Sequence, residues 1–364
     1  MRMDRLEKYL RDMMLIPALA GHEQKMAAYM KNVFTGLGLE TFIDTFGNCI
    51  AKVPGTDPEA PKVMVFSHMD QLGFLVRRIE DDGFIRLERL GGIPEKVLPG
   101  TPVQIQTESG DMVDGLVGVK SHHVTPPEEK YVVEPYMNLY VDIGATSRQQ
   151  VVDLGIEVGA PVVYKPQFVK MQGTRIYGTS VDNRAGCTIV LGLAHKLTEK
   201  RPKATVYVVG TVQEEFNLRG AMMAARSIKP DIAVSVDGGG ATDTPDLKGR
   251  GEISLGNGPH MSLYNFHGRG TLNGTIPHPA MVRLMQTAAK KANIALQRGA
   301  SIGGLTDLAY VQLEGTGVMS IDIGAPVRYA HSPVESCDLR DLEQTVDLLA
   351  AFLDEITSET VFTR

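Results

Sequence analysis

The chain has 364 residues, of which 43% are hydrophobic and 22% are charged. These values are typical of a globular protein that is long enough to bury a full core. The formal net charge of −6 at pH 7 argues against a nucleic-acid partner, which usually requires a basic face. Because no apolar run approaches the length of a membrane span, we also expect no membrane association.

The cysteine content indicates a reducing compartment. Cys49, Cys187 and Cys337 lie far apart, their number is odd, and no CxxC motif occurs. Secreted disulfide frameworks usually contain an even number of cysteines. Acidic residues within segment 1–20 also interrupt what would be the basic region of an export signal. The protein is therefore expected in the cytoplasm.

The first elements are predicted from apolar periodicity. Segment 1–20 is interpreted as a helix, followed by a second helix over 26–37 and a buried strand over 62–67. One face of the first helix carries the apolar residues Leu6, Leu10, Met13 and Met14.

The pattern of apolar and polar residues changes after residue 71. Short alternating segments, separated by Gly or Pro, occupy 83–89, 102–107 and 112–119. This pattern predicts a small β-rich, barrel-like module over residues 72–168. We expect its short strands to need a covered edge or a partner face, because unpaired strand edges favour aggregation.

Alternation of helices and strands returns after residue 172. It predicts an α/β/α sandwich with a mostly parallel central sheet, built from residues 1–71 and 169–364 and interrupted by the module. Helices are expected over 185–199, 218–227, 279–293 and 339–356, and strands over 204–213, 231–236 and 317–323.

Acidic residues and histidines gather where predicted strands end or helices begin. In open α/β sheets the carboxyl ends of strands are where ligands bind. His68 and Asp70 follow the strand 62–67, Asp182 precedes the helix 185–199, Glu214 and Glu215 follow the strand 204–213, Asp237 follows 231–236, and His331 follows the strand ending near residue 323.

These residue types support a narrow chemistry. Two imidazoles with several carboxylates and no cysteine suit a borderline divalent metal such as zinc, cobalt or manganese. One carboxylate can bridge two ions about 3.5–4 Å apart. The neighbouring side chains of Glu214 and Glu215 point in different directions, so one can bind metal while the other accepts a proton from the attacking water.

Each of these residues also has a plain structural interpretation. A His-x-Asp pair is commonly hydrogen-bonded, and a Glu-Glu pair is commonly solvated. Asp182 and Asp237 could cap helices or form turns, and His331 could close a turn before Ser332-Pro333. Their conjunction in one order, at predicted element ends, favours a functional site.

Six motifs make the chain similar to one known family, the tetrahedral (TET) aminopeptidases, whose members also carry the names glutamyl aminopeptidase and endoglucanase-M. Together the motifs span most of the chain. They are HMDQLGFLV (68–76), DIGATSRQQVVDLGIEVGAPVV (142–163), SVDNRAG (180–186), VQEEFNLRGA (212–221), GGLTDL (303–308) and RYAHSPVESCDLRDLE (328–343).

The resemblance implies a zinc-peptidase-like sandwich with two divalent ions, zinc or cobalt, or else manganese. It implies a dinuclear aminopeptidase that removes N-terminal residues from short peptides. In this scheme His68 and Asp237 hold one ion, and Glu215 and His331 hold the other. Asp182 bridges the two ions. Glu214 is the general base on a metal-bridging water, and Asp70 orients His68.

The resemblance further implies that the inserted module is a dimerisation domain and that twelve subunits form a hollow tetrahedron. His122 and His123 lie in this module. Adjacent histidines on a strand point to opposite faces, so we expect an interface or structural role for them rather than a shared metal.

The chain departs from the family without losing a ligand position. Asn183 stands where Asp is usual, and Phe216-Asn217, Leu305, Leu308 and Gly324–Pro326 also differ. We therefore expect a substrate pocket of its own.

Two other functions remain open. One is a related dinuclear amidohydrolase, such as a dipeptidase or deacylase, which would not require a free α-amine. The other is a non-catalytic scaffold that keeps the fold. Retention of the presumed ligands and of Glu214 argues against the scaffold, and the two histidines argue against glycoside hydrolysis, which generally uses two carboxylates without metal.

Overall fold

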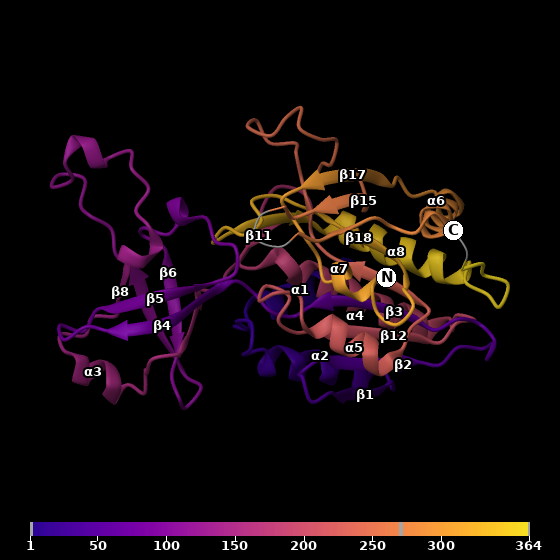
Figure 1. Cartoon of the computed structure of the whole chain (residues 1–364), viewed down its shortest axis with the longest axis horizontal. Coiled ribbons are helices and arrows are strands. Elements are labelled where there is room, and N and C mark those ends of the chain that lie inside the picture. The colour runs from indigo at the N-terminus through magenta and orange to yellow at the C-terminus, as the bar shows by residue number, and fades with distance from the viewer. Residues whose placement is uncertain (1–2, 269–271, 363–364) are drawn as a thin grey trace.

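The chain forms an α/β body and a smaller β-barrel that projects from it (Figure 1). The structure is a computed structural model, and it describes residues 3–268 and 272–362. In those ranges no helix combines the length and apolar character needed to cross a membrane.

A nine-stranded sheet forms the centre of the body. Its order is β1-β2-β12-β3-β13-β18-β15-β16, with β17 beside β15. The four middle strands, β12-β3-β13-β18, are parallel, whereas the next strand on each side, β2 or β15, is antiparallel to its inner neighbour. The predicted mostly parallel sheet is confirmed. The strands are β1 Glu40–Ile43, β2 Cys49–Val53, β3 Val63–His68, β12 Val206–Thr211, β13 Ile232–Val236, β15 His260–Phe266, β16 Gly274–Thr275, β17 Gln297–Ile302 and β18 Met319–Gly324.

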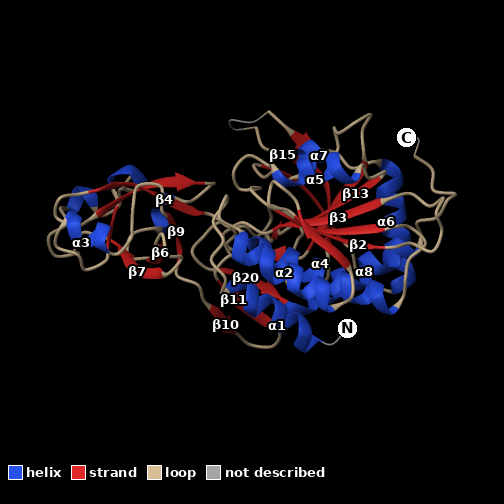
Figure 2. Cartoon of the chain, turned by 90° about the horizontal axis from the view of Figure 1, so that it is seen from below, coloured by secondary structure: helices blue, strands red, loops and turns tan. Residues whose placement is uncertain are grey.

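Helices cover both faces of this sheet, as Figure 2 shows. Alternate strand residues serve the two faces: Val65 belongs to the core cluster that contains residues of α1, α2, α4, α6 and α8, whereas Phe66 belongs to the cluster that contains residues of α5 and α7. The four apolar residues predicted on the first helix are all buried, which confirms its orientation. The helices are α1 Met3–Met14, α2 Gln24–Gly36, α4 Val181–Glu199, α5 Gly220–Ile228, α6 Pro279–Ala292, α7 Leu308–Val311 and α8 Leu339–Asp354.

The inserted module is a closed barrel in the order β4-β5-β8-β7-β6-β9. It has its own apolar core. Of the two expected ways to protect its strand edges, the barrel uses coverage rather than a partner face, because closure pairs each barrel strand on both sides. The barrel comprises β4 Gly73–Ile79, β5 Ile85–Leu90, β6 Pro102–Gln106, β7 Met112–Val117, β8 Tyr140–Asp142 and β9 Pro161–Tyr164, with α3 Arg148–Asp153 and the 3₁₀ turns Glu95–Val97, Pro127–Glu129 and Tyr136–Asn138.

Two small sheets lie outside the barrel and the central sheet. One contains β10 (Phe168–Lys170), β11 (Arg175–Gly178) and β20 (Glu335–Asp338), and the other contains β14 (Gly239–Gly240) and β19 (Pro326–Val327). They correct the predicted position of His331. Asp182 follows β11, and His331 lies in the loop between β19 and β20 rather than directly after the strand ending near residue 323.

One helix begins later than its apolar pattern predicts. The expected helix over 218–227 starts at Gly220, because Asn217 and Leu218 have φ values of 73° and 57°. These left-handed conformations cannot belong to an α-helix. The chain therefore makes a tight turn between Glu215 and the helix.

Candidate metal centre

Asp182 lies between two imidazoles. Its Oδ1 is 3.2 Å from His68 Nε2, and its Oδ2 is 3.6 Å from His331 Nε2. Each carboxylate oxygen therefore faces a different histidine. A carboxylate in this position can bind one cation through each oxygen.

Each histidine also has a second carboxylate close to it. Asp237 Oδ1 is 3.8 Å from His68 Nε2, and Glu215 Oε1 is 4.0 Å from His331 Nε2. Potential ligand atoms of His68, Asp182 and Glu215 lie within 4.8 Å of one another, and so do those of His68, Glu214 and Asp237. The second group contains Glu214, which the sequence analysis predicts as a base rather than a ligand.

The opposite nitrogens of the two rings contact carbonyl oxygens. His68 Nδ1 is 3.2 Å from the carbonyl of Asp70 and 3.5 Å from its carboxylate. His331 Nδ1 is 2.7 Å from the carbonyl of Gly92, which follows barrel strand β5. If each Nδ1 carries the hydrogen for these contacts, each Nε2 presents its lone pair to the carboxylates.

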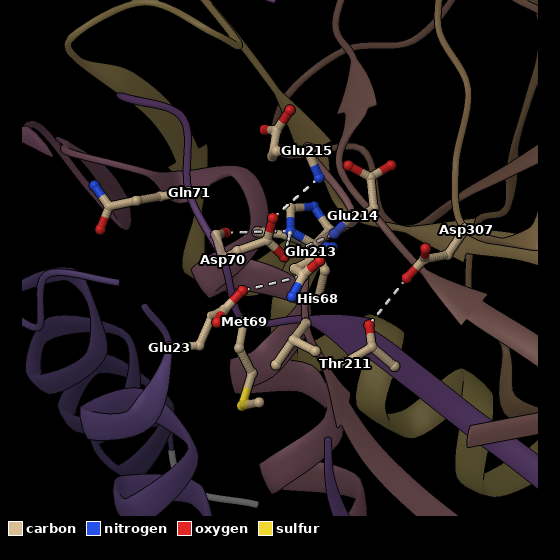
Figure 3. A network of polar contacts seen from close by, with 12 residues as sticks. Glu23, His68, Met69, Asp70, Gln71, Thr211, Gln213, Glu214, Glu215 and Asp307 are labelled. Carbon is tan, nitrogen blue, oxygen red and sulfur yellow. Dashed lines mark hydrogen bonds and ion pairs between the residues drawn. The ribbon is translucent and has the colours of Figure 1, made fainter. Parts of the chain in front are cut away.

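Asp70 also contacts the segment that follows β12. Its two oxygens accept hydrogen bonds from the backbone N–H groups of Glu214 and Glu215, each at 3.0 Å (Figure 3). Its carboxylate thus holds the segment that carries both glutamates. The predicted proximity of Asp70 to His68 is present, and this second contact was not expected.

Negative charge dominates the site. Burial raises the pKa of Glu214 and of Asp237 well above the usual carboxyl range, and burial raises the pKa of Glu215 to about 7. Burial opposes the charged form of His331, yet Glu215 and Asp182 raise its pKa to about 9. The buried carboxyl groups at this site therefore outnumber the two imidazoles that could carry positive charge. Divalent cations would supply the missing positive charge. The donor set consists of nitrogen and oxygen, which fits zinc, cobalt or manganese.

The comparisons with known proteins decide the family. The family model described as M42 glutamyl aminopeptidase matches residues 47–348. The chain belongs to the M42 glutamyl aminopeptidase family. It is 31% identical over 343 residues to a lysyl aminopeptidase of Pyrococcus furiosus, with coverage of 93% of this chain and 94% of the relative.

Solved structures of this family share the whole fold. An aminopeptidase from the archaeon Desulfurococcus kamchatkensis superposes with a TM-score of 0.92 at 31% identity, covering 98% of this chain and 96% of that chain. The TET1 peptidase of Pyrococcus horikoshii, which can assemble into a tetrahedron or a large octahedral shell, superposes with a TM-score of 0.84 at 27% identity, covering 96% and 100%. The M42 chain is therefore a peptide hydrolase with the TET fold.

Glu335 is a site residue that the sequence analysis missed. It is 2% exposed, and its two oxygens accept the backbone N–H groups of Asp182 and His331 at 2.7 and 2.6 Å. It therefore ties the central carboxylate to one of the histidines through their main chains. Its place four residues after His331, inside a family motif, was the available signal.

Asn183, where the family usually has Asp, is fully buried. Its Nδ2 donates hydrogen bonds to Asp237 Oδ1 and to the carbonyl of Val236, both at 2.9 Å. A deprotonated aspartate could not donate these bonds. The substitution therefore adds a neutral donor to Asp237 and removes one negative charge from an already acidic site.

Asp307, in the motif 303–308, is a second missed residue. It is 2% exposed, and one oxygen accepts a hydrogen bond from the Thr211 hydroxyl at 3.0 Å (Figure 3). Its other oxygen has no hydrogen-bond partner among the described residues. Burial raises its pKa to about 7.

The metal centre opens into a cavity of about 780 Å³ lined by residues of both the body and the loop beyond β5. Arg250 lines this cavity. Arg328 instead forms a two-bond contact with Asp243, at 2.8 and 2.5 Å. A space of this size accommodates a short peptide end rather than a folded protein.

Proposed function

We propose that this protein is a dinuclear metal-dependent aminopeptidase that removes N-terminal residues from short peptides. The observation that carries the proposal is the position of Asp182, with one oxygen facing His68 and the other facing His331. His68 and Asp237 would hold one ion, Glu215 and His331 the other, and Asp182 both. Two divalent ions of zinc, cobalt or manganese would polarise the scissile carbonyl and acidify a water.

Glu214 is the general base in this proposal. Its backbone N–H donates to Asp70, and its buried carboxylate lies near His68 among the residues that line the cavity. From there Glu214 accepts a proton from the attacking water and can return it to the leaving amine. The acidic character of this part of the cavity supports binding of a positively charged α-amine, which an aminopeptidase substrate carries.

The barrel would provide the primary interface between two copies of the chain. We define the arm as residues 118–139, between β7 and β8. Large apolar side chains are exposed along it, including Tyr131, which is 96% exposed; the others are Val119, Val124, Val132, Val133 and Met137. Exposed apolar groups of this density favour a protein partner, and the symmetric partner for a homo-oligomer is a second copy.

His122 and His123 also lie on the arm, with their ring planes nearly perpendicular and centroids 5.7 Å apart. Both are exposed, which supports an interface role. Further closure into a dodecamer, in the manner of the tetrahedral TET1 peptidase, would enclose the active sites. Three free buried cysteines support a cytoplasmic location.

A substrate screen tests the function. Metal-stripped protein is reconstituted with zinc, cobalt or manganese and tested on aminoacyl fluorogenic substrates and on their N-acetylated forms. We expect activity on free amines that depends on added metal. Equal release of the fluorophore from N-acetylated substrates would instead support a related amidohydrolase that needs no free α-amine, and metal binding without any hydrolysis would support a scaffold.

A further inference from the structure

The segment that carries Glu214 and Glu215 is held by side chains rather than by a neighbouring strand. Strand β12 ends at Thr211, and the next four backbone N–H groups all donate to side-chain oxygens. Asn48 Oδ1 accepts from residue 212 at 3.1 Å, and Glu23 Oε1 accepts from residue 213 at 3.1 Å. Asp70 accepts from residues 214 and 215.

These three acceptors come from separate parts of the N-terminal region. Glu23 immediately precedes α2, Asn48 lies in the loop between β1 and β2, and Asp70 follows β3. Buried backbone N–H groups require a partner, and the segment has left the sheet that would supply one. Its path therefore depends on three side chains that are remote in sequence.

Residue 213 is where this path changes direction. Gln213 has a φ of 57°, a left-handed conformation that a non-glycine residue adopts only when its surroundings hold it. The hydrogen bond from its N–H to Glu23 is the contact that fixes this peptide (Figure 3). The next residue along the chain is Glu214.

Glu23 is an unusual residue to find in this position. It is 5% exposed, and burial together with nearby Asp70 raises its pKa to about 7. The same oxygen also accepts the N–H of Gly21 at 2.7 Å. Burying a carboxylate is costly, so a neutral apolar residue would serve better if only packing were required.

Asn48 closes the other side of the same loop. Its side chain is fully buried, and while its oxygen accepts from Val212, its Nδ2 donates to the carbonyl of Gly220 at 3.0 Å. Asn48 thus joins the last residue before the turn to the first residue of α5. The loop from 212 to 220 is anchored at its start, at its turn and at its end.

We infer that Glu23 is a positioning residue for the reaction, acting through the backbone of Gln213 to set the place of the Glu214 carboxylate, with Asn48 supporting the same segment. This inference rests on the proposed role of Glu214 as general base. Glu23 is not among the potential metal-binding groups, so its removal should disturb turnover rather than metal content. A displacement of about 1 Å at a reacting group can reduce rates by about 10²-fold.

Two substitutions separate the hydrogen bond from the charge. Glu23→Gln keeps an oxygen that can accept from Gln213 and Gly21 but removes the negative charge. Glu23→Ala removes the acceptor, and Glu23→Asp withdraws it by one methylene in case the alanine variant does not fold. Asp341→Ala is the matched control, because Asp341 is also buried, accepts hydrogen bonds from the N–H groups of two glycines at 2.7 and 2.8 Å, and is not among the residues that line the cavity.

The variants are measured by kcat and KM on the best wild-type substrate, by bound metal, and by hydrogen–deuterium exchange of the peptide spanning 206–219. We expect Glu23→Ala or Glu23→Asp to lower kcat about 10- to 100-fold, with KM within about threefold and two metals retained. Exchange in 206–219 should rise. Glu23→Gln should keep kcat within about threefold of wild type, and Asp341→Ala should change neither kcat nor exchange in this peptide.

Several results would overturn the inference. They are an unchanged kcat in folded Glu23→Ala or Glu23→Asp, a loss of metal that accounts for the loss of kcat, and equal damage from Glu23→Gln. Failure of the proposed function is distinct, because wild-type protein would then lack aminopeptidase activity or Glu214→Gln would retain it.

Discussion

The α/β body and the barrel bury different kinds of side chain. Every buried charged residue among the described residues lies outside residues 72–168, and the buried polar residues inside that range are only Thr101 and Thr107. The body thus accepts the cost of desolvating many ionisable groups, whereas the barrel has an ordinary apolar interior. The candidate catalytic groups therefore lie in the body. The distinctive groups of the barrel are instead the exposed side chains of the arm.

One contact joins the two regions at the metal centre. The carbonyl of Gly92, in the loop after β5, lies 2.7 Å from His331 Nδ1. The barrel side of the molecule therefore helps orient one imidazole of the body. Away from this contact, substitutions in the two regions should have separable effects, on turnover and metal content for the body and on assembly for the barrel.

The largest expected effect is on turnover. Glu214→Gln should lower kcat about 10²- to 10⁴-fold, because it removes the proton acceptor. It should retain two metals, since the proposed ligands remain. Kinetics and metal analysis on the same preparation test this. A near-normal kcat would refute the role of Glu214 as general base. Loss of one metal would indicate that Glu214 is a ligand, which its proximity to His68 and Asp237 allows.

The next effect is on metal content. Asp182→Ala should weaken both ions together, because each oxygen of Asp182 faces a different histidine. His68→Ala should weaken chiefly one ion, with an affinity loss of at least about 10-fold. Metal titration by calorimetry distinguishes the two patterns. Tight binding of two ions by Asp182→Ala would assign the bridge to another residue.

The barrel should govern assembly. The double substitution Tyr131→Glu and Val132→Glu places two charges on an apolar stretch of the arm, where 96% and 66% of the two side chains are exposed. We expect light scattering to show that this variant associates at least about 10-fold more weakly than the wild-type protein. Val361→Glu, at a 63% exposed position of the body, is the control. A wild-type mass of 39.6 kDa would remove the interface altogether.

The smallest expected effect is an acid sensitivity of the body. Burial lowers the pKa of His260, on β15, to about 4. Below about pH 6.5, His260 binds a proton in the unfolded chain but not in the folded chain. The free energy of unfolding is therefore undiminished by this group above pH 6.5 and falls as the pH approaches 4. At pH 5.5 the loss is about 1.4 kcal/mol. Denaturant unfolding of metal-stripped protein should show a flatter pH dependence for His260→Gln, and identical slopes would contradict the assignment.

The sequence predicts the site better than it predicts what supports the site. His68, Glu214, Glu215 and Asp237 come from ends of the central strands, as alternation of apolar segments and helices indicated. Asp182 and His331 reach the same place from the small sheets, whose two- to four-residue strands carry too little periodicity to be recognised.

The supporting residues are hidden for a different reason. Glu23, Asn48 and Glu335 act by accepting backbone N–H groups of residues far away in the chain. Any acidic or amide side chain can do this, and the peptide group that it meets carries no sequence signal. Only the tertiary arrangement identifies such a residue.

The ends of the inserted module meet. Phe74, near its start, pairs in register with Val162, near its end, on neighbouring strands β4 and β9. For the rest of the chain, a folded barrel is thus equivalent to a short turn, whereas an unfolded one is a loop of roughly ninety residues with a larger closure entropy. Folding of the barrel before the body would therefore lower the entropic cost of joining residues 1–71 with the C-terminal portion of the body.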